Sequence, residues 1–289
     1  MWVTRKAAIT SIVLTVIHLV LGYSFADAAK KSPDAASTSG KVLGRLLLTG
    51  SSTMAPLMKE IGKRFQESHP GVIVEVEAGG SGRGISDVRA GKSDIGMASR
   101  ALTDKEGDLY GFPIARDGVC VIIHMNNPVK ALSDSQVADI FTGRIANWKK
   151  VGGRDAPIVV LNPAERHSST ELFTHYFGLK YSEIKAHQTV GDNPTRIRAV
   201  VEKPHSICYV SVGEAERKAH AGAPIKLLPV SGVAATSRNI ATGNFPISRP
   251  LTLVTKKLPA GLVKEFIEFS LSSQVIDLIP AFDFVPYSD

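Results

Sequence analysis

The chain has 289 residues, of which 44% are hydrophobic and 21% charged, and its formal net charge is +7. This apolar content is typical of a globular protein with hydrophobic cores, and the length suits one large or two ordinary domains. The positive charge suits anionic ligands. Aromatic residues make up only 7% and the charges are interspersed, so no nucleic-acid interface is expected.

Residues 1–28 have the features of a secretory signal peptide. Arg5 and Lys6 precede the apolar stretch 7–22, and Ala26-Asp27-Ala28 forms an A-x-A cleavage site. We expect cleavage after Ala28. The alternatives are cleavage at Ser24-Phe25-Ala26 and a retained membrane anchor.

No cysteine lies near this junction, so we do not expect a lipoprotein. The Ser-, Ala- and Pro-containing segment 29–40 is typical of a flexible lead-in. No later segment is long and apolar enough to span a bilayer. The expected protein is therefore exported to the periplasm and soluble there.

Beyond the lead-in, strand-like and helix-like patterns alternate along the chain. Strands are expected at 46–48, 72–78, 94–98, 118–125, 157–161, 207–212, 225–230 and 251–255. Helices are expected at 52–69, 85–90, 171–177, 193–202 and 261–271, with shorter ones after the capping residues Thr103 and Ser133. Repeated strand–helix units predict an α/β fold with mainly parallel sheets.

A turn of small hydroxyl residues follows the first expected strand. This turn is Gly50-Ser51-Ser52-Thr53, and Pro56 shortly after it is tolerated in the first turn of a helix. The start of a helix has unpaired N–H groups and a positive partial charge, so it attracts anions. For one such turn alone, an ordinary N-cap is the alternative.

Similar turns recur at three further places. They are the glycine-rich turn 79–84, Ser99-Arg100, and Arg166 with the hydroxyl residues 168–170. Glycines let the backbone approach a ligand closely, and their N–H groups form an anion-binding concavity. Each turn follows an expected strand, and ligands of open α/β sheets bind outside the carboxyl ends of strands. Together the four turns predict a site for a small oxyanion.

The sequence lacks the residues or spacings that the common motifs for catalysis, cofactor binding and metal binding require. Ser86 stands where a P-loop ending in Gly91-Lys92-Ser93 requires glycine, and Arg83 stands where a G-x-S-x-G elbow requires one. The histidines are scattered, without metal-ligand spacing. No catalytic residue, cofactor or metal is therefore expected. Cys120 and Cys208 lie in apolar strand-like runs and are either buried free thiols or a disulfide.

The motifs TGSSTMAPL, GGSGRG and DIGMASR, followed by DIFTGRIANWKKVGG and the HSST turn, resemble the phosphate-binding proteins of bacterial phosphate-specific ABC transporters. The resemblance covers about residues 45–287. It implies a type II periplasmic binding protein fold, an α/β fold of two lobes joined by two hinge crossovers. Lobe one would be 41–122 plus 250–289, and lobe two 123–249. The ligand would lie in the cleft between the lobes, which would close by a hinge motion.

The resemblance also implies a set of ligand-binding residues, with Asn193 as a weaker candidate. These are Ser51, Ser52, Thr53, Ser81, Gly82, Ser99, Arg100, Arg166, Ser168, Ser169 and Thr170. The implied function is capture of inorganic phosphate by a monomeric, non-enzymatic protein and its delivery to the membrane permease of an ABC transporter.

Two positions depart from the pattern of that family. Arg100 replaces an Asp that would accept the proton of phosphate and reject fully ionised sulfate. Glu171 follows the HSST turn where Arg is frequent. Three alternatives are therefore left open: binding of another oxyanion such as sulfate, molybdate or tungstate, an exported phosphoester hydrolase, and a ligand-free sensor on the same fold.

Overall fold

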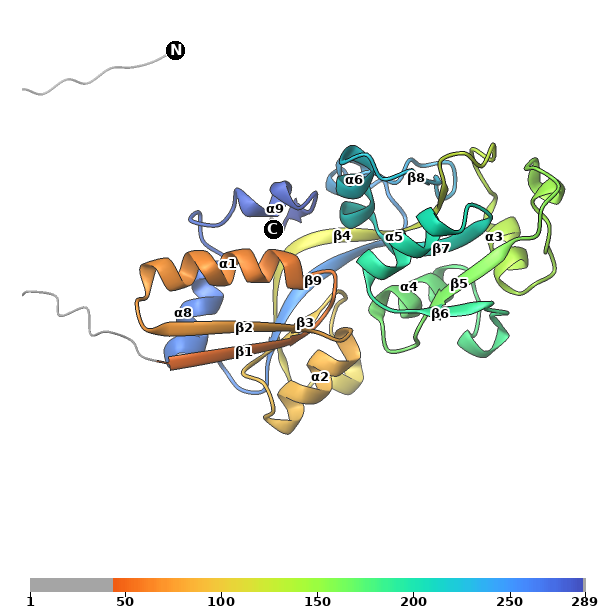
Figure 1. Cartoon of the computed structure of the whole chain (residues 1–289). Helices are drawn as coiled ribbons and strands as arrows, with labels where there is room; N and C mark the ends of the chain where they lie inside the picture. The colour runs from red at the N-terminus through yellow and green to blue at the C-terminus, as the bar shows by residue number, and fades with distance from the viewer. Residues whose placement is uncertain (1–43, 288–289) are drawn as a thin grey trace, which may run out of the picture. The chain divides into compact units, whose positions relative to one another are not determined.

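The computed structural model describes residues 44–287, and the expected signal peptide and lead-in lie outside these residues. The strands form a path of hydrogen-bonded neighbours in the order β2-β1-β3-β9-β4-β7-β5-β6, and β8 and β10 also pair with β4 (Figure 1). None of the helices within 44–287 is long and apolar enough to cross a membrane.

The N-terminal part of the fold is a parallel β–α unit. Strands β1 (Gly44–Gly50), β2 (Val72–Ala78) and β3 (Ile95–Ala98) are parallel, with β1 between the other two. Helices α1 (Ala55–Ser68) and α2 (Ser81–Ala90) connect them. These strands and helices were predicted, although the helices begin at different residues.

Both helices differ from the predictions at their N-termini. Helix α1 begins at Ala55 rather than Ser52, and α2 begins at Ser81 rather than Ile85. Part of the glycine-rich segment is therefore helical. A Cβ atom at Gly84 would lie 2.7 Å from the carbonyl oxygen of Thr49, so this glycine permits close packing of α2 on β1.

Strands β4 (Tyr110–His124) and β9 (Ser248–Thr255) lie side by side and run antiparallel (Figure 1). β4 pairs with β9 as far as Gly118 and then with β7 (Ser206–Ser211) from Val119 onward. Strand β9 also pairs antiparallel with β3. The prediction of mainly parallel sheets is therefore wrong, because two long antiparallel strands stand between the parallel groups.

The C-terminal side of β4 adjoins a second parallel group, in which β5 (Val159–Pro163) pairs with both β6 (Gln188–Val190) and β7. The remaining strands, β8 (Ile225–Leu227) and β10 (Val285–Pro286), pair antiparallel with β4. The remaining α-helices are α3 (Asp134–Phe141), α4 (Ser168–Tyr176), α5 (Asn193–Glu202), α6 (Val212–His220), α7 (Ser237–Ala241), α8 (Gly261–Ser270) and α9 (Leu278–Ala281). Short 3₁₀ helices occupy Asp104–Glu106, Trp148–Val151 and Tyr181–Glu183.

The buried side chains form two large hydrophobic cores. Along β4, Ile114 and Ala115 belong to the core that includes β1, α1 and α8, whereas Val119 and the residues after it belong to the other. In the second core, the rings of Phe173 and Tyr209 stack with centroids 3.9 Å apart. Burying a large apolar side chain contributes about 1.5–3 kcal/mol, so each core can hold its own helices on its strands.

Cys120 on β4 and Cys208 on β7 are both buried and free. They lie on neighbouring strands but are not opposite each other, because Cys120 pairs with Val210 and Cys208 pairs with Ile122. Of the two alternatives for these residues, the structure shows the free thiols.

The predicted capping box at Thr103 and Glu106 is confirmed and includes a third residue, Arg100. The Glu106 carboxylate accepts the Thr103 N–H at 2.8 Å and two guanidinium N–H groups of Arg100 at 2.7 Å each. Glu106 is buried. The Arg100 guanidinium lowers the pKa of Glu106 to about 2, so this ion pair fixes the turn after β3.

Glu106→Gln should lower the free energy of unfolding at neutral pH and weaken its dependence on pH in acid. The folded-state pKa of Glu106 lies below its ordinary value of 4.5, so its contribution is complete above pH 4.5 and is lost as the pH falls toward about 2. The variant should lose about 1–3 kcal/mol at pH 7 and show a flatter decline between pH 4.5 and 2. Urea unfolding at several pH values measures both quantities.

The matched control is Glu183→Gln, because Glu183 also caps a 3₁₀ helix but is exposed. Its decline in acid should follow that of the unsubstituted protein. An unchanged decline in Glu106→Gln would contradict a stabilising role for the Arg100–Glu106 pair.

Candidate functional site

The four turns expected to bind an anion all follow the carboxyl ends of strands. Strands β1, β2, β3 and β5 end at Gly50, Ala78, Ala98 and Pro163. Ligands of open α/β sheets bind at this edge, so the predicted placement of the turns is confirmed. What the side chains of each turn contact differs from turn to turn.

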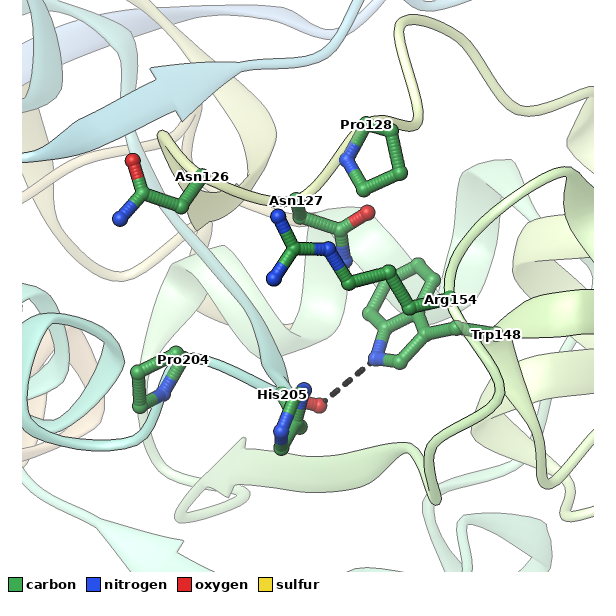
Figure 2. Close-up of a pocket in the computed structure, with 7 residues that line it drawn as sticks. All are labelled: Asn126, Asn127, Pro128, Trp148, Arg154, Pro204 and His205. Atoms are coloured by element: carbon green, nitrogen blue, oxygen red, sulfur yellow. Dashed lines mark hydrogen bonds between the residues drawn. The ribbon is translucent and has the colours of Figure 1, made fainter.

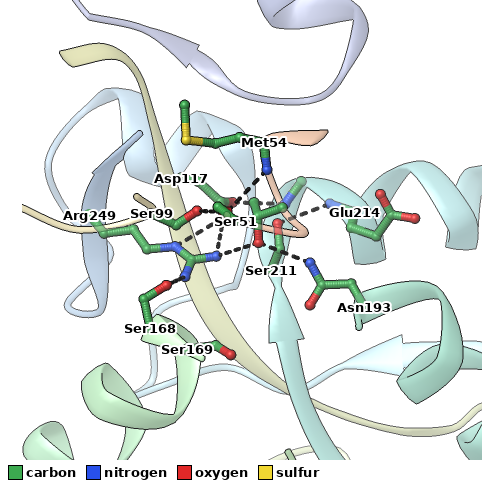
Figure 3. Close-up of polar contacts among 12 residues, drawn as sticks. Ser51, Met54, Ser99, Asp117, Ser168, Ser169, Asn193, Ser211, Glu214 and Arg249 are labelled. Atoms are coloured by element: carbon green, nitrogen blue, oxygen red, sulfur yellow. Dashed lines mark hydrogen bonds and ion pairs between the residues drawn. The ribbon is translucent and has the colours of Figure 1, made fainter. Parts of the chain in front are cut away.

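A guanidinium that was not predicted as a site residue joins the first and fourth turns. Arg249, on β9, is 2% exposed. Its Nη2 donates to Thr53 Oγ1 at 3.1 Å and its Nη1 to Ser168 Oγ at 3.3 Å. Figure 3 shows this guanidinium beside Ser168. One side chain thus contacts hydroxyls from segments more than a hundred residues apart in the sequence.

Asp117 holds Arg249 in place. The two residues are opposite each other in the β4–β9 register, and Arg249 Nη2 and Nε donate to Asp117 Oδ2 at 2.7 and 3.2 Å. The other carboxylate oxygen accepts the Gly213 N–H at 3.2 Å. Both charged side chains are almost completely buried, and a buried pair is stable only when its hydrogen bonds are made in this way.

A second buried guanidinium, that of Arg196 on α5, contacts the same cluster. Its Nη1 donates to Ser169 Oγ at 2.8 Å and to Asn193 Oδ1 at 3.2 Å, and its Nε donates to the Gly191 carbonyl at 2.8 Å. Asn193 Nδ2 in turn donates to Thr53 Oγ1 at 3.0 Å. Arg196 Nη2 is buried and has no hydrogen-bond partner among residues 44–287. Burial lowers the pKa of Arg196 to about 10, so it stays charged at pH 7.

The first three turns are tied together by hydroxyl groups. The Oγ atoms of Ser51 and Ser99 are hydrogen bonded to each other, and Ser81 Oγ accepts the Ser99 N–H at 3.0 Å. Ser51, Ser81 and Ser99 are all buried, whereas Ser52 is partly exposed. We define the polar cluster by its buried residues, which are Ser51, Thr53, Ser81, Ser99, Asp117, Ser168, Ser169, Asn193, Arg196 and Arg249.

The polar cluster carries an excess of positive charge. It contains two buried guanidinium groups, Arg196 and Arg249, but a single buried carboxylate, Asp117. Asp117 pairs with Arg249, and within residues 44–287 Arg196 has no ion-pair partner. An unpaired buried charge costs several kcal/mol. The arrangement therefore suits an anion that would accept the free N–H of Arg196.

Arg100 and Thr170 are held in contacts of their own. In addition to its bonds with Glu106, Arg100 has its Nε 2.8 Å from Glu171 Oε2. The two residues that depart from the family pattern therefore pair with each other. Thr170 Oγ1 donates to the Ala164 carbonyl at 3.0 Å and accepts the Tyr209 hydroxyl at 3.2 Å, which fixes the N-terminus of α4.

Arg166 and Gly82 lie at the edge of the cluster. Arg166 is exposed, and its Nε donates to the Gly79 carbonyl at 3.1 Å while its own carbonyl accepts the Gly82 N–H at 3.3 Å. These bonds join the second and fourth turns, one from the Arg166 side chain and one between backbone groups. Asn193 is the first residue of α5 rather than its predicted N-cap, because Asp192 accepts the Thr195 N–H.

His167 was not predicted as a site residue, although it immediately precedes Ser168. It is 5% exposed, and its Nε2 is buried without a hydrogen-bond partner in the part of the chain that the structure describes. Burial, with the nearby charges of Arg196 and Arg166, lowers the pKa of His167 to about 4. The imidazole is therefore neutral at pH 7.

The missed residues leave only faint signals in the sequence. Arg196 has the spacing of one helix face with Asn193 and Val200, and all three residues are buried. The available clue was therefore a charged residue on a helix face that is otherwise buried. Asp117 and Arg249 interrupt or precede apolar strands, and nothing local indicates that they meet.

A separate small pocket of about 40 Å³ is lined by Asn126, Asn127, Pro128, Trp148, Arg154, Pro204 and His205 (Figure 2). Trp148 Nε1 donates to the His205 carbonyl at 2.8 Å. The pocket shares no residue with the polar cluster. The Asn-Trp segment of the sequence therefore anchors neighbouring backbone and does not belong to the candidate site.

Known proteins resemble this chain over most of its length. A family model described as a PBP superfamily domain matches residues 35–274. The phosphate-binding protein PstS of Bacillus subtilis (strain 168) is 30% identical over 253 residues, which are 86% of this chain and 82% of that protein.

Solved structures agree with this relationship. A putative phosphate ABC transporter substrate-binding protein with bound phosphate from Clostridium perfringens has a TM-score of 0.78 and 31% identity, covering 84% of this chain and 100% of that one. An ABC-type phosphate transport receptor from Vibrio cholerae has a TM-score of 0.69 and 28% identity over the same shares. The α/β periplasmic-binding-protein fold expected from the sequence is thereby confirmed, and the chain belongs to the PstS family of phosphate-binding proteins within the PBP superfamily.

Proposed function

We propose that this protein binds inorganic phosphate at the polar cluster and delivers it to the membrane permease of an ABC transporter. One observation carries the proposal: among the hydroxyls of the turns lie two buried guanidinium groups but one buried carboxylate, Asp117, which pairs with Arg249 alone. The names of its relatives in Bacillus subtilis and Clostridium perfringens support phosphate as the ligand. Those relatives are binding proteins, and we propose the same non-enzymatic role here.

The proposed ligands come from three kinds of group. Arg196 and Arg249 supply charged donors, and hydrogen bonds from charged donors are about twice as strong as neutral ones. The predicted hydroxyl residues of the polar cluster supply neutral donors. The N-termini of α1, α2 and α4 follow or overlap the turns and add backbone N–H groups to an anion site. Ser52, Gly82 and Arg166 would line its edge.

We also propose that the site lies between two lobes, with lobe one formed by 41–122 plus 250–289 and lobe two by 123–249. The division of the hydrophobic cores along β4 supports two lobes, and it places the change of core between Ala115 and Val119, a few residues before the proposed limit. Contacts across the proposed cleft include Asn193 with Thr53 and Arg100 with Glu171. A hinge in β4 and β9 would then open and close the site.

The location and assembly of the protein complete the proposal. The basic residues, the apolar stretch and the A-x-A sequence of residues 1–28 support export through a signal peptide and cleavage after Ala28. The mature protein would act as a periplasmic monomer without a lipid anchor. Mass spectrometry of the exported protein tests the cleavage site and any lipid modification.

Arg196→Met should weaken phosphate binding without a comparable loss of stability. Removing a charged hydrogen-bond donor costs about 1.5–3 kcal/mol, which is roughly a 10- to 150-fold rise in Kd. The ligand-free variant should keep its stability within about 1 kcal/mol, because an unpaired buried charge is removed with the lost hydrogen bonds. Calorimetric titration with phosphate at pH 7 and urea unfolding measure the two effects.

The matched control for this variant is Arg198→Met, which removes the same charge from an exposed position on the same helix. Its Kd should stay close to that of the unsubstituted protein. Equal affinities in the Arg196 and Arg198 variants would exclude the polar cluster as the binding site.

Glu171→Gln should speed phosphate release. Loss of its ion pair with Arg100 weakens the contact across the proposed cleft by about 0.2–1 kcal/mol, the usual range for partly exposed pairs. Loss of the negative charge alone would reduce repulsion of the anion and slow its release. Faster release therefore indicates loss of the ion pair, and slower release indicates loss of the charge. Stopped-flow measurement of the dissociation rate distinguishes these two outcomes.

Glu165→Gln is the control, because Glu165 is exposed on the preceding turn and the substitution removes the same charge. Release should be unchanged or slower in this variant. Slower release in both variants would show that Glu171 acts only through long-range charge and would contradict its role in closure.

A further inference from the structure

The residues that surround the polar cluster raise the question of how it distinguishes phosphate from sulfate. Near pH 7 phosphate carries at least one proton, whereas sulfate carries none. Hydroxyl and guanidinium donors bind the ionised oxygens of both. A site that favours phosphate needs a hydrogen-bond acceptor facing the protonated oxygen, because that acceptor is left unpaired against sulfate.

Three carboxylates in and around the polar cluster are already engaged with protein donors. Asp117 uses one oxygen for Arg249 and the other for the Gly213 N–H. Glu106 and Glu171 face Arg100. These three groups are therefore engaged with protein donors, and Asp192, a fourth carboxylate near Arg196 and His167, caps α5 by accepting the Thr195 N–H.

His167 has the properties that these carboxylates lack. It is the N-cap residue of α4, directly before Ser168 and Ser169, whose hydroxyls accept hydrogen bonds from Arg249 and Arg196. Its Nε2 is buried and accepts or donates no hydrogen bond within the described residues 44–287. A buried nitrogen without a partner loses its hydrogen bond to water, so such a group requires an explanation.

The surroundings of the ring hold it near the second turn. A Cβ atom at Gly80 would lie 3.2 Å from His167 Nδ1, and Gly80 has a φ of +92° that favours glycine. The imidazole therefore packs where the second and fourth turns meet. Burial and the charges of Arg196 and Arg166 disfavour the imidazolium form, which leaves one ring nitrogen with a free lone pair at pH 7.

We propose that His167 Nε2 accepts a hydrogen bond from the protonated oxygen of bound phosphate, and that His167 is therefore the residue that makes the site favour phosphate over sulfate. In this arrangement Nδ1 carries the ring proton. The proposal rests on the proposed function, since it requires an oxyanion in the polar cluster. It assigns to His167 the acceptor role that the sequence left without a residue once Arg100 replaced the expected Asp.

The test compares phosphate and sulfate in calorimetric titrations at pH 7. The unsubstituted protein should bind phosphate at least about tenfold more tightly than sulfate. His167→Phe keeps an aromatic ring but removes the acceptor, so phosphate affinity should fall about tenfold or more while sulfate affinity stays the same or rises. His167→Gln retains an acceptor oxygen and should keep part of the preference.

His175→Phe is the matched control, because His175 is exposed on the same helix. It should leave both affinities unchanged. Equal losses of phosphate and sulfate affinity in His167→Phe would mean that the ring donates to the ligand, and an unchanged ratio would mean that it does not contact the ligand. Either result overturns the proposal. Failure of the unsubstituted protein to bind either anion would instead overturn the proposed function.

A second measurement uses the unsubstituted protein. Nitrogen-15 NMR of the phosphate-bound form should show the His167 ring in the neutral tautomer with the proton on Nδ1. The opposite tautomer, or a charged ring, would overturn the proposal even if the His167 variants failed to fold.

Discussion

The buried ion pair between Asp117 and Arg249 is the interaction on which the polar cluster depends. The register of β4 and β9 sets the two residues opposite each other, and neither could stay buried and charged without the other. With one edge of its guanidinium on Asp117, Arg249 directs its other N–H groups at Thr53 and Ser168. A pair formed between two long strands thereby orients hydroxyls from distant turns.

Arg196 adds a charge that the fold does not neutralise. Its helix presents it to the interior together with Asn193, and its contacts there are with neutral oxygens of Ser169, Asn193 and Gly191. A protein interior accepts such a charge at a cost that a bound anion can offset. In the proposed site, ligand binding and stability would therefore be coupled at this residue.

The charged residues at the edge of the cluster form contacts of a different kind. Arg100 is bonded to Glu106 and lies beside Glu171. This residue, which the sequence predicted to bind the ligand, therefore stabilises a turn and contacts α4. Because Glu171 is half exposed, its pairing is weak and reversible. Contacts of this strength would suit surfaces that separate and meet again during the proposed hinge motion.

Much of the architecture is a local property of the sequence. Apolar periodicity, the Thr103 and Ser133 capping boxes and the turn residues indicated most strands and helices, and the recurrence of hydroxyl turns after strands indicated an oxyanion site. Helix starts were less well predicted, since the packing of Gly84 on β1 is a tertiary contact. The first half of β4 was missed because Gly111 and Pro113 interrupt its apolar pattern.

The identity of the charged groups in the cluster was decided only by the tertiary structure. Four of these residues lie in different segments of the sequence, and no local pattern shows that their side chains meet: Asp117, His167, Arg196 and Arg249. Their positions follow from strand register and helix orientation, which bring side chains from many segments to one place. The sequence by itself determined that donors stand at the ends of the strands. Only the fold decided which guanidinium groups are buried without a full complement of carboxylates, because burial and pairing are properties of three-dimensional neighbours.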